Sequence, residues 1–122
     1  MINIRKLFSS FHYAYSGVIY ALSHDQNLRV HIFAGVLVII ASIFFRVSGF
    51  EMGILGLMIL LVMCSEMVNT AIEKMVDLIT TEHRKEAKIA KDVAAGMVLV
   101  AVVGSVIVGI LIFTPHIIKF FF

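Results

Sequence analysis

Apolar and polar side chains alternate along residues 3–23 with the spacing of a two-faced helix. Its apolar members recur at steps of three and four and are Ile4, Leu7, Phe8, Phe11, Tyr15, Val18, Ile19 and Leu22. This spacing predicts an amphipathic helix. Because long apolar segments follow it, we expect the helix to lie on a membrane surface with its apolar face in the lipid boundary.

Three longer apolar segments come next, separated by polar stretches near residues 23–27, 47–51 and 80–92. A helix of about 20 apolar residues crosses a hydrocarbon core of about 30 Å. The expected spans are residues 30–46, 50–79 with a cytosolic extension, and 93–113, and residues 80–92 are expected to form a cytosolic loop. The pattern thus predicts one all-α membrane domain over residues 1–122, with a surface helix and three transmembrane helices.

The composition agrees with a membrane protein and argues against nucleic-acid binding. Hydrophobic residues make up 61% of the chain, more than a soluble domain of this size could hide from water. The net charge is only +2, and no basic patch is interleaved with aromatic residues, so no nucleic-acid partner is expected.

The basic residues predict the orientation of the spans. Threading the chain three times through a membrane puts eight basic residues on the side of the N-terminus and two on the other. The eight are Arg5, Lys6, Arg29, Lys74, Arg84, Lys85, Lys88 and Lys91, and the two are Arg46 and Lys119. By the positive-inside rule, the N-terminus and the polar loop are expected to face the cytosol.

A polar stripe marks the cytosolic end of the second span. On a helix at about 100° per residue, Glu66, Glu73 and Asp77 lie within about 40° of one another, and Asn69 lies about 60° from Glu66. An ionisable residue in a span costs roughly 2.5–3.5 kcal/mol on insertion scales, so a functional role is the default interpretation. The alternative is a carboxylate paired with a basic residue of a neighbouring helix.

The polar residues expected at this interface suit phosphoryl transfer. Asp25 joins the acids of the stripe, and Lys91 and Asp92 stand at the start of the third span with His83 and Arg84 nearby. Carboxylates suit Mg²⁺, which proteins usually hold with one or two of them plus substrate phosphates, and Lys or Arg suits phosphate oxygens. The set fits an enzyme that moves phosphate from a soluble nucleotide to a lipid hydroxyl.

Other interpretations remain open. Asp92 also suits the N-cap of the third span, a role compatible with a catalytic one. Arg84, Lys85 and Lys88 also serve as topology determinants, and His83 as a solvated loop residue. For the whole protein, the rivals are a small ion channel or transport subunit that uses the carboxylates as an ion relay, and a structural oligomer without chemistry.

Two motifs resemble one bacterial family. The segment from Glu66 through Asn69 and Glu73 to Asp77 resembles the E-x-x-N-[ST]-A-I-E-x-x-x-D signature of the prokaryotic diacylglycerol kinase and undecaprenol kinase family. Residues 87–96, which include Lys91 and Asp92, resemble its A-K-x-x-K-D-x-A-A-G run. The spacing of the motifs and the layout of surface helix plus three spans are also similar, so the resemblance covers nearly the whole chain.

The resemblance implies roles for single residues. It implies that Glu66 is the catalytic base that takes a proton from the lipid hydroxyl, and that Glu73 binds the metal. It also implies five nucleotide-binding residues, which are Tyr13, Asn69, Asp77, Lys91 and Asp92. It also implies the use of ATP and Mg²⁺, and a homotrimer in which each active site is built from two subunits.

One metal position departs from the family pattern, and two residues bear on the substrate. The second metal carboxylate, usually a glutamate, is Asp25 here, which keeps the charge but is one methylene shorter. Asn27 and His31 are more similar to the undecaprenol kinases than to the diacylglycerol-preferring members. The expected substrate is therefore undecaprenol, with diacylglycerol as the alternative.

Overall fold

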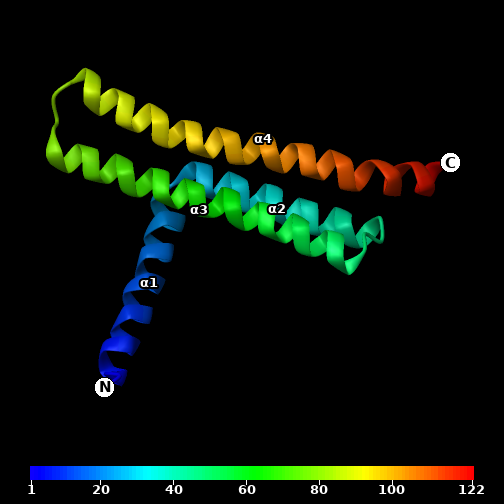
Figure 1. Ribbon diagram of the computed structural model, residues 1–122, viewed down its shortest axis with the longest axis horizontal. Coiled ribbons are helices and arrows are strands. Elements are labelled where there is room, and N and C mark those ends of the chain that lie inside the picture. Colours follow the sequence, from blue (N-terminus) through cyan, green and yellow to red (C-terminus); the bar gives the residue numbers. More distant parts are fainter.

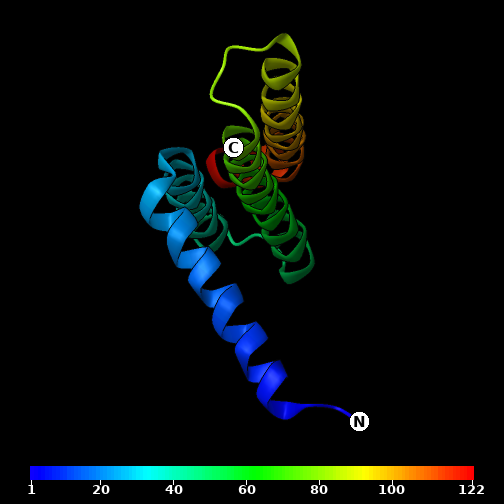
Figure 2. The same ribbon diagram turned by 90° about the vertical axis from the view of Figure 1, so that its left-hand side faces the viewer.

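The computed structural model describes all 122 residues and contains four helices. They are α1 (Ile4–His24), α2 (Gln26–Phe44), α3 (Gly49–Ile79) and α4 (Lys85–Phe121). Helices α2, α3 and α4 lie side by side in an elongated bundle, and α1 leaves it at a steep angle where α2 begins (Figures 1 and 2). Each bundle helix is long and apolar enough to cross a membrane. The predicted all-α membrane fold is confirmed.

The start of α4 differs from the prediction. Residues 85–92 were expected in the cytosolic loop, but α4 begins at Lys85, so the non-helical connection shortens to residues 80–84. Hydropathy marks where an apolar segment begins, whereas Lys, Glu and Ala extend a helix well into water. The N-cap interpretation of Asp92 is wrong, because Arg84 occupies that position and Asp92 lies inside the helix.

The end of α4 also extends further than expected. The third span was expected over residues 93–113, yet the helix continues through Pro115 to Phe121. A proline inside a helix costs about 3 kcal/mol, so the extension over residues 114–121 needs support from elsewhere. Aromatic packing supplies it, since the Phe120 ring centroid lies 5.3 Å from that of Phe44 and 5.6 Å from that of Phe45.

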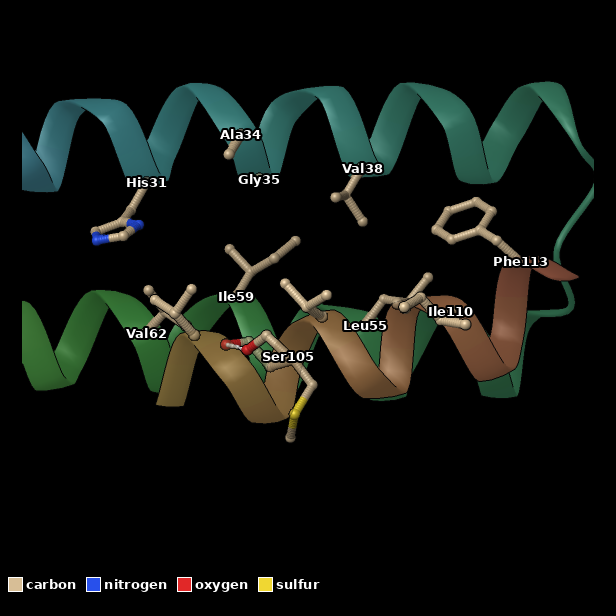
Figure 3. Close-up of a pocket in the computed structure, with 14 residues that line it drawn as sticks. His31, Ala34, Gly35, Val38, Leu55, Ile59, Val62, Ser105, Ile110 and Phe113 are labelled. Carbon is tan, nitrogen blue, oxygen red and sulfur yellow. Dashed lines mark hydrogen bonds between the residues drawn. The ribbon is translucent and has the colours of Figure 1, made fainter. Parts of the chain in front are cut away.

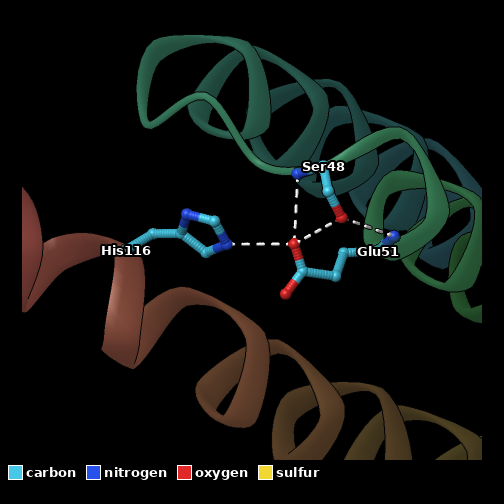
Figure 4. Close-up of polar contacts among 3 residues, drawn as sticks. All are labelled: Ser48, Glu51 and His116. Carbon is cyan, nitrogen blue, oxygen red and sulfur yellow. Dashed lines mark hydrogen bonds and ion pairs between the residues drawn. The ribbon is translucent and has the colours of Figure 1, made fainter.

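A polar contact joins α3 to α4 at the end of the bundle that carries the α2–α3 turn (Figure 4). Ser48 is the N-cap of α3 and forms a capping box with Glu51, so the helix starts at Gly49, within the polar stretch near residues 47–51. Glu51 Oε2, which accepts the backbone N–H of Ser48 at 3.1 Å, also lies 3.0 Å from Nε2 of His116 on α4. The contact adjoins a small core of Val47, Leu55 and Ile112.

Little of the chain is buried, and one close helix contact stands out. Only 14 of the 122 residues are buried, so most apolar side chains of the spans are left to face lipid or another copy of the chain. Between α2 and α3, a Cβ atom added at Gly35 would lie 2.9 Å from Cγ2 of Ile59. The absence of a side chain at Gly35 therefore sets how closely α2 approaches α3.

Candidate active site

The polar stripe of α3 turns towards the start of α2. Glu66 is only 2% exposed and Asn69 6%, although neither has a Lys or Arg partner. Glu66 is therefore not neutralised by a basic residue of a neighbouring helix, whereas Asp77, further along the stripe, pairs with Lys91 of α4. Burying a carboxylate without such a partner is costly, which is typical of a group kept for function.

Asp25 approaches this stripe from the junction of α1 and α2. Its Oδ1 accepts the backbone N–H groups of Asn27 at 2.8 Å and Leu28 at 3.2 Å, so Asp25 is the N-cap of α2. Its Oδ2 accepts the hydroxyl of Thr70 on α3 at 2.5 Å. An aspartate is short enough to cap the helix that follows it, and the cap fixes where its second oxygen lies.

Together these residues line a polar pocket of about 180 Å³, called here the carboxylate pocket. Its nine residues are His24, Asp25, Gln26, Asn27, Glu66, Asn69, Thr70, Glu73 and Lys74. Asn69 Nδ2 donates to Glu73 Oε1 at 3.4 Å, while Asn69 Oδ1 is buried without any partner. The pocket thus joins three carboxylates to an unpaired amide oxygen, a set of hard acceptors that leaves room for a cation or a donor.

A second pocket, the loop pocket, lies beyond the first, where α3 continues past the start of α2. It is about 610 Å³ and is lined by residues of α3, the 80–84 connection and α4, including Asp77, Arg84, Lys88, Lys91 and Asp92. Three of its four lysines and arginines are paired with acids, and Lys85 is not. Lys91 Nζ donates to Asp77 Oδ1 at 2.6 Å, and Lys88 and Arg84 pair with Asp92 and Glu82.

The structure therefore brings the expected site residues together in two groups. Asp25, Glu66, Asn69 and Glu73 share the carboxylate pocket, and Asp77, Lys91 and Asp92 share the loop pocket. No three acidic, histidine or cysteine side chains of the chain are close enough to form a metal-binding group on their own. A cation in the carboxylate pocket would take its remaining ligands from water or a phosphate, as Mg²⁺ usually does.

Tyr13 belongs to neither pocket. It lies on α1, is 72% exposed and sits on the part of the helix that projects from the bundle (Figure 2). Within one chain, nothing brings its side chain to the nucleotide position implied by the resemblance. Its role remains a prediction that requires a second copy of the chain.

Sequence reasoning missed Thr70. It stands in the same motif as Glu66 and four residues later, so it lies about 40° from Glu66 on the helix. Its position on the stripe was a usable signal. A hydroxyl carries no charge, however, and in a sequence it does not by itself indicate a site as a buried acid does.

An apolar groove of about 260 Å³ lies between α2, α3 and α4 (Figure 3). It runs from His31 and Val62 at one end towards Phe113 at the other, and ten of its 14 lining residues are hydrophobic. Val62 lies one helical turn before Glu66, so the groove begins next to the carboxylate pocket. This pairing suits an amphiphile with a polar head and an apolar tail.

The fold and site define a small helical membrane protein whose acidic pocket adjoins an apolar groove. Residues 12–113 match the family described as Prokaryotic diacylglycerol kinase. The chain belongs to this family and is a lipid kinase, which confirms the resemblance seen in the two motifs.

The relatives of the chain are named for two different substrates, diacylglycerol and undecaprenol. The chain is 46% identical over 104 residues to a diacylglycerol kinase of Synechocystis sp., covering 84% of this chain but 59% of that protein. It is 40% identical over 112 residues to an undecaprenol kinase of Bacillus subtilis, covering 92% of this chain and 91% of the relative. A diacylglycerol kinase of Haemophilus influenzae is 32% identical over 109 residues, covering 88% and 92%.

Proposed function

We propose that the chain transfers the γ-phosphate of ATP to the hydroxyl of undecaprenol, giving undecaprenyl phosphate. The observation that carries the proposal is the buried, unpaired Glu66 at the junction of the carboxylate pocket and the apolar groove. The undecaprenol kinase of Bacillus subtilis supports the polyprenol substrate, because the match covers about nine tenths of both chains. The higher identity to the Synechocystis protein supports diacylglycerol as the alternative.

In this proposal Glu66 acts as the general base. The lipid tail lies along the apolar groove, and its hydroxyl reaches the carboxylate of Glu66. Glu66 accepts the hydroxyl proton as the lipid oxygen bonds to the γ-phosphorus, and the bond from that phosphorus to the bridging oxygen of ADP breaks. A buried carboxylate suits the role because it has no competing cation and little competing water.

The donor set of the carboxylate pocket fits Mg²⁺. Glu73 and Asp25 would hold the ion, and the unpaired Oδ1 of Asn69 supplies a further hard acceptor in the same pocket. When bound, the ion would neutralise charge on the phosphates. Asn69, Asp77, Lys91 and Asp92 would contact the nucleotide, with Lys91 exchanging its partner Asp77 for a phosphate oxygen.

The proposal extends to assembly and location. The exposed apolar sides of the spans and the isolated position of Tyr13 support a homotrimer in which α1 of one copy completes the site of another. The distribution of basic residues supports a bacterial cytoplasmic membrane with the N-terminus and both pockets on the cytosolic side.

A competition assay tests the proposed reaction. Purified full-length protein in vesicles receives Mg²⁺, γ-labelled ATP, and undecaprenol and diacylglycerol together. Label should appear mainly in undecaprenyl phosphate. Label in phosphatidic acid instead would replace the substrate, and no labelled lipid would contradict the proposal and favour a channel or transport role.

A further inference from the structure

The junction between α1 and α2 is held by its own hydrogen bonds. Arg29 Nη1 donates to the carbonyl oxygens of Leu22 at 2.9 Å and Ser23 at 3.0 Å, groups that the end of α1 leaves without helical partners. Asp25 caps the start of α2 through Oδ1, and Leu28, 1% exposed, anchors the first turn. Residues 22–29 therefore form a compact unit, here called the elbow.

Thr70 links α3 to the elbow through a side-chain hydrogen bond. Its hydroxyl donates to Asp25 Oδ2 at 2.5 Å across 45 residues of sequence. Hydroxyls inside helices usually donate to the carbonyl four residues earlier. Ser42, Ser105 and Thr114 do so here, with distances of 2.7, 2.8 and 2.6 Å. Thr70 instead directs its hydroxyl to another helix junction.

The hydrogen bonds leave Asp25 one free acceptor direction. A carboxylate has about four lone-pair sites, two on each oxygen. Two backbone N–H groups occupy those of Oδ1, and Thr70 occupies one on Oδ2. One site remains on Oδ2, at the wall of the pocket that Glu66 and Glu73 also line.

We infer that Thr70 is a positioning residue: its hydroxyl orients the carboxylate of Asp25 and holds the elbow against α3, so that Asp25 presents a single lone pair to a cation in the carboxylate pocket. The cation part of this inference rests on the proposed function. The holding of the elbow does not, because it follows from the hydrogen bonds alone.

The test compares Thr70→Val, which removes the hydroxyl but keeps the shape, with Thr70→Ser, which keeps the hydroxyl. Thr114→Val on α4 is the matched control. Hydrogen exchange of the backbone amides of residues 26–30 is measured first, in full-length protein in lipid without Mg²⁺. Thr70→Val should exchange these amides several-fold faster, because its Asp25 carboxylate is free to turn away from the cap. Thr70→Ser and Thr114→Val should match the wild type.

The second measurement is the Mg²⁺ concentration for half-maximal turnover. Thr70→Val should raise it about tenfold while the rate at saturating Mg²⁺ stays within about twofold, the effect expected when a residue that orients a metal ligand is lost. Thr70→Ser should restore the wild-type value.

Each outcome decides the inference. Unchanged exchange in Thr70→Val overturns the holding of the elbow, and an unchanged Mg²⁺ dependence overturns the orientation of Asp25. A Thr70→Ser protein that behaves like Thr70→Val would assign the effect to the lost methyl group. If Thr70→Val does not fold, Thr70→Ala removes the same hydroxyl. If the wild type phosphorylates no lipid, the proposed function fails while the exchange measurement still decides the elbow.

Discussion

Glu66 shares its pocket with two other carboxylates and has no Lys or Arg partner, an arrangement that costs stability and needs a use. Asp25 and Glu73 line the same pocket, and its one lysine, Lys74, forms no ion pair with any of them. Three carboxylates in a pocket of about 180 Å³ repel one another. Binding of a divalent cation would relieve that repulsion, so the site gains its stability from its ligands.

The variant Glu66→Gln tests the role of this carboxylate. Glutamine keeps the shape of the side chain but does not accept a proton, so turnover should fall by roughly 10²–10⁴, the usual contribution of a general base. The protein should remain folded, as judged by its thermal unfolding in detergent. Glu86→Gln on the exposed start of α4 is the matched control and should retain activity. Full turnover in Glu66→Gln would remove Glu66 from the mechanism.

The residues of the site were predictable to the extent that charge and helical spacing define them. Glu66, Asn69 and Glu73 share a face because of their spacing, and the structure places them in one pocket. Asp25 both caps α2 and accepts the hydroxyl of Thr70, and this pair of interactions was not predictable. It depends on the direction of α2 and on a hydroxyl 45 residues away. The ion pair of Lys91 with Asp77 likewise depends on how α4 lies beside α3.

At the scale of helices, Gly35 decides how α2 fits against α3. A Cβ there would meet Cγ2 of Ile59 at 2.9 Å, closer than side chains normally approach. The start of α2 carries Asp25, so a displacement of this helix would also move one wall of the carboxylate pocket.

Gly35→Ala should therefore destabilise the protein by about 1–3 kcal/mol, the usual cost of overpacking. In an Ile59→Ala background the contacting atom is absent, and the same substitution should cost little. Gly53→Ala on α3 is the control, because nothing lies within 4 Å of the added atom, and it should be neutral or stabilising. Thermal unfolding of the four variants measures these differences, and equal costs of Gly35→Ala in both backgrounds would contradict the argument.

Helix existence was predictable, as was the end of the second span at residue 79, whereas the two ends of α4 were not. Long apolar runs indicate membrane spans, so the number of spans and their order along the chain could be predicted. Residues 85–92 and 114–121 lie outside the apolar run, so their conformation depends on helix propensity, on the pairing of Lys88 with Asp92, and on aromatic contacts of Phe120. The aromatic contacts come from the assembled bundle, whereas Lys88 and Asp92 pair within one turn of α4.

The whole molecule has two unlike ends. The elbow, both pockets and the 80–84 connection lie towards one end of the bundle, while the α2–α3 turn and the end of α4 lie at the other (Figure 1). Since the three spans run in alternating directions, residues 83 and 122 are expected on opposite sides of the membrane.

Labelling of single cysteines checks this orientation. Cys64 is the only cysteine, so a Cys64→Ser background accepts His83→Cys or Phe122→Cys as a unique target. A membrane-impermeant maleimide should label position 122 in spheroplasts and position 83 only after the membrane is opened. The reverse pattern would contradict the positive-inside assignment.

If Asp25 holds the metal as proposed, the shortest helix of the bundle would link turnover to the thickness of the bilayer. With 19 residues, α2 is about 28 Å long, close to a hydrocarbon core of about 30 Å, whereas α3 and α4 have 31 and 37 residues and length to spare. In a thicker bilayer, α2 cannot lengthen, so Asp25 is drawn towards the acyl chains or its bond to Thr70 is strained. Turnover in phosphatidylcholine vesicles of increasing acyl length should therefore decline beyond the ordinary thickness, and a flat profile would show that neighbouring copies, and not α2, set the depth of the site.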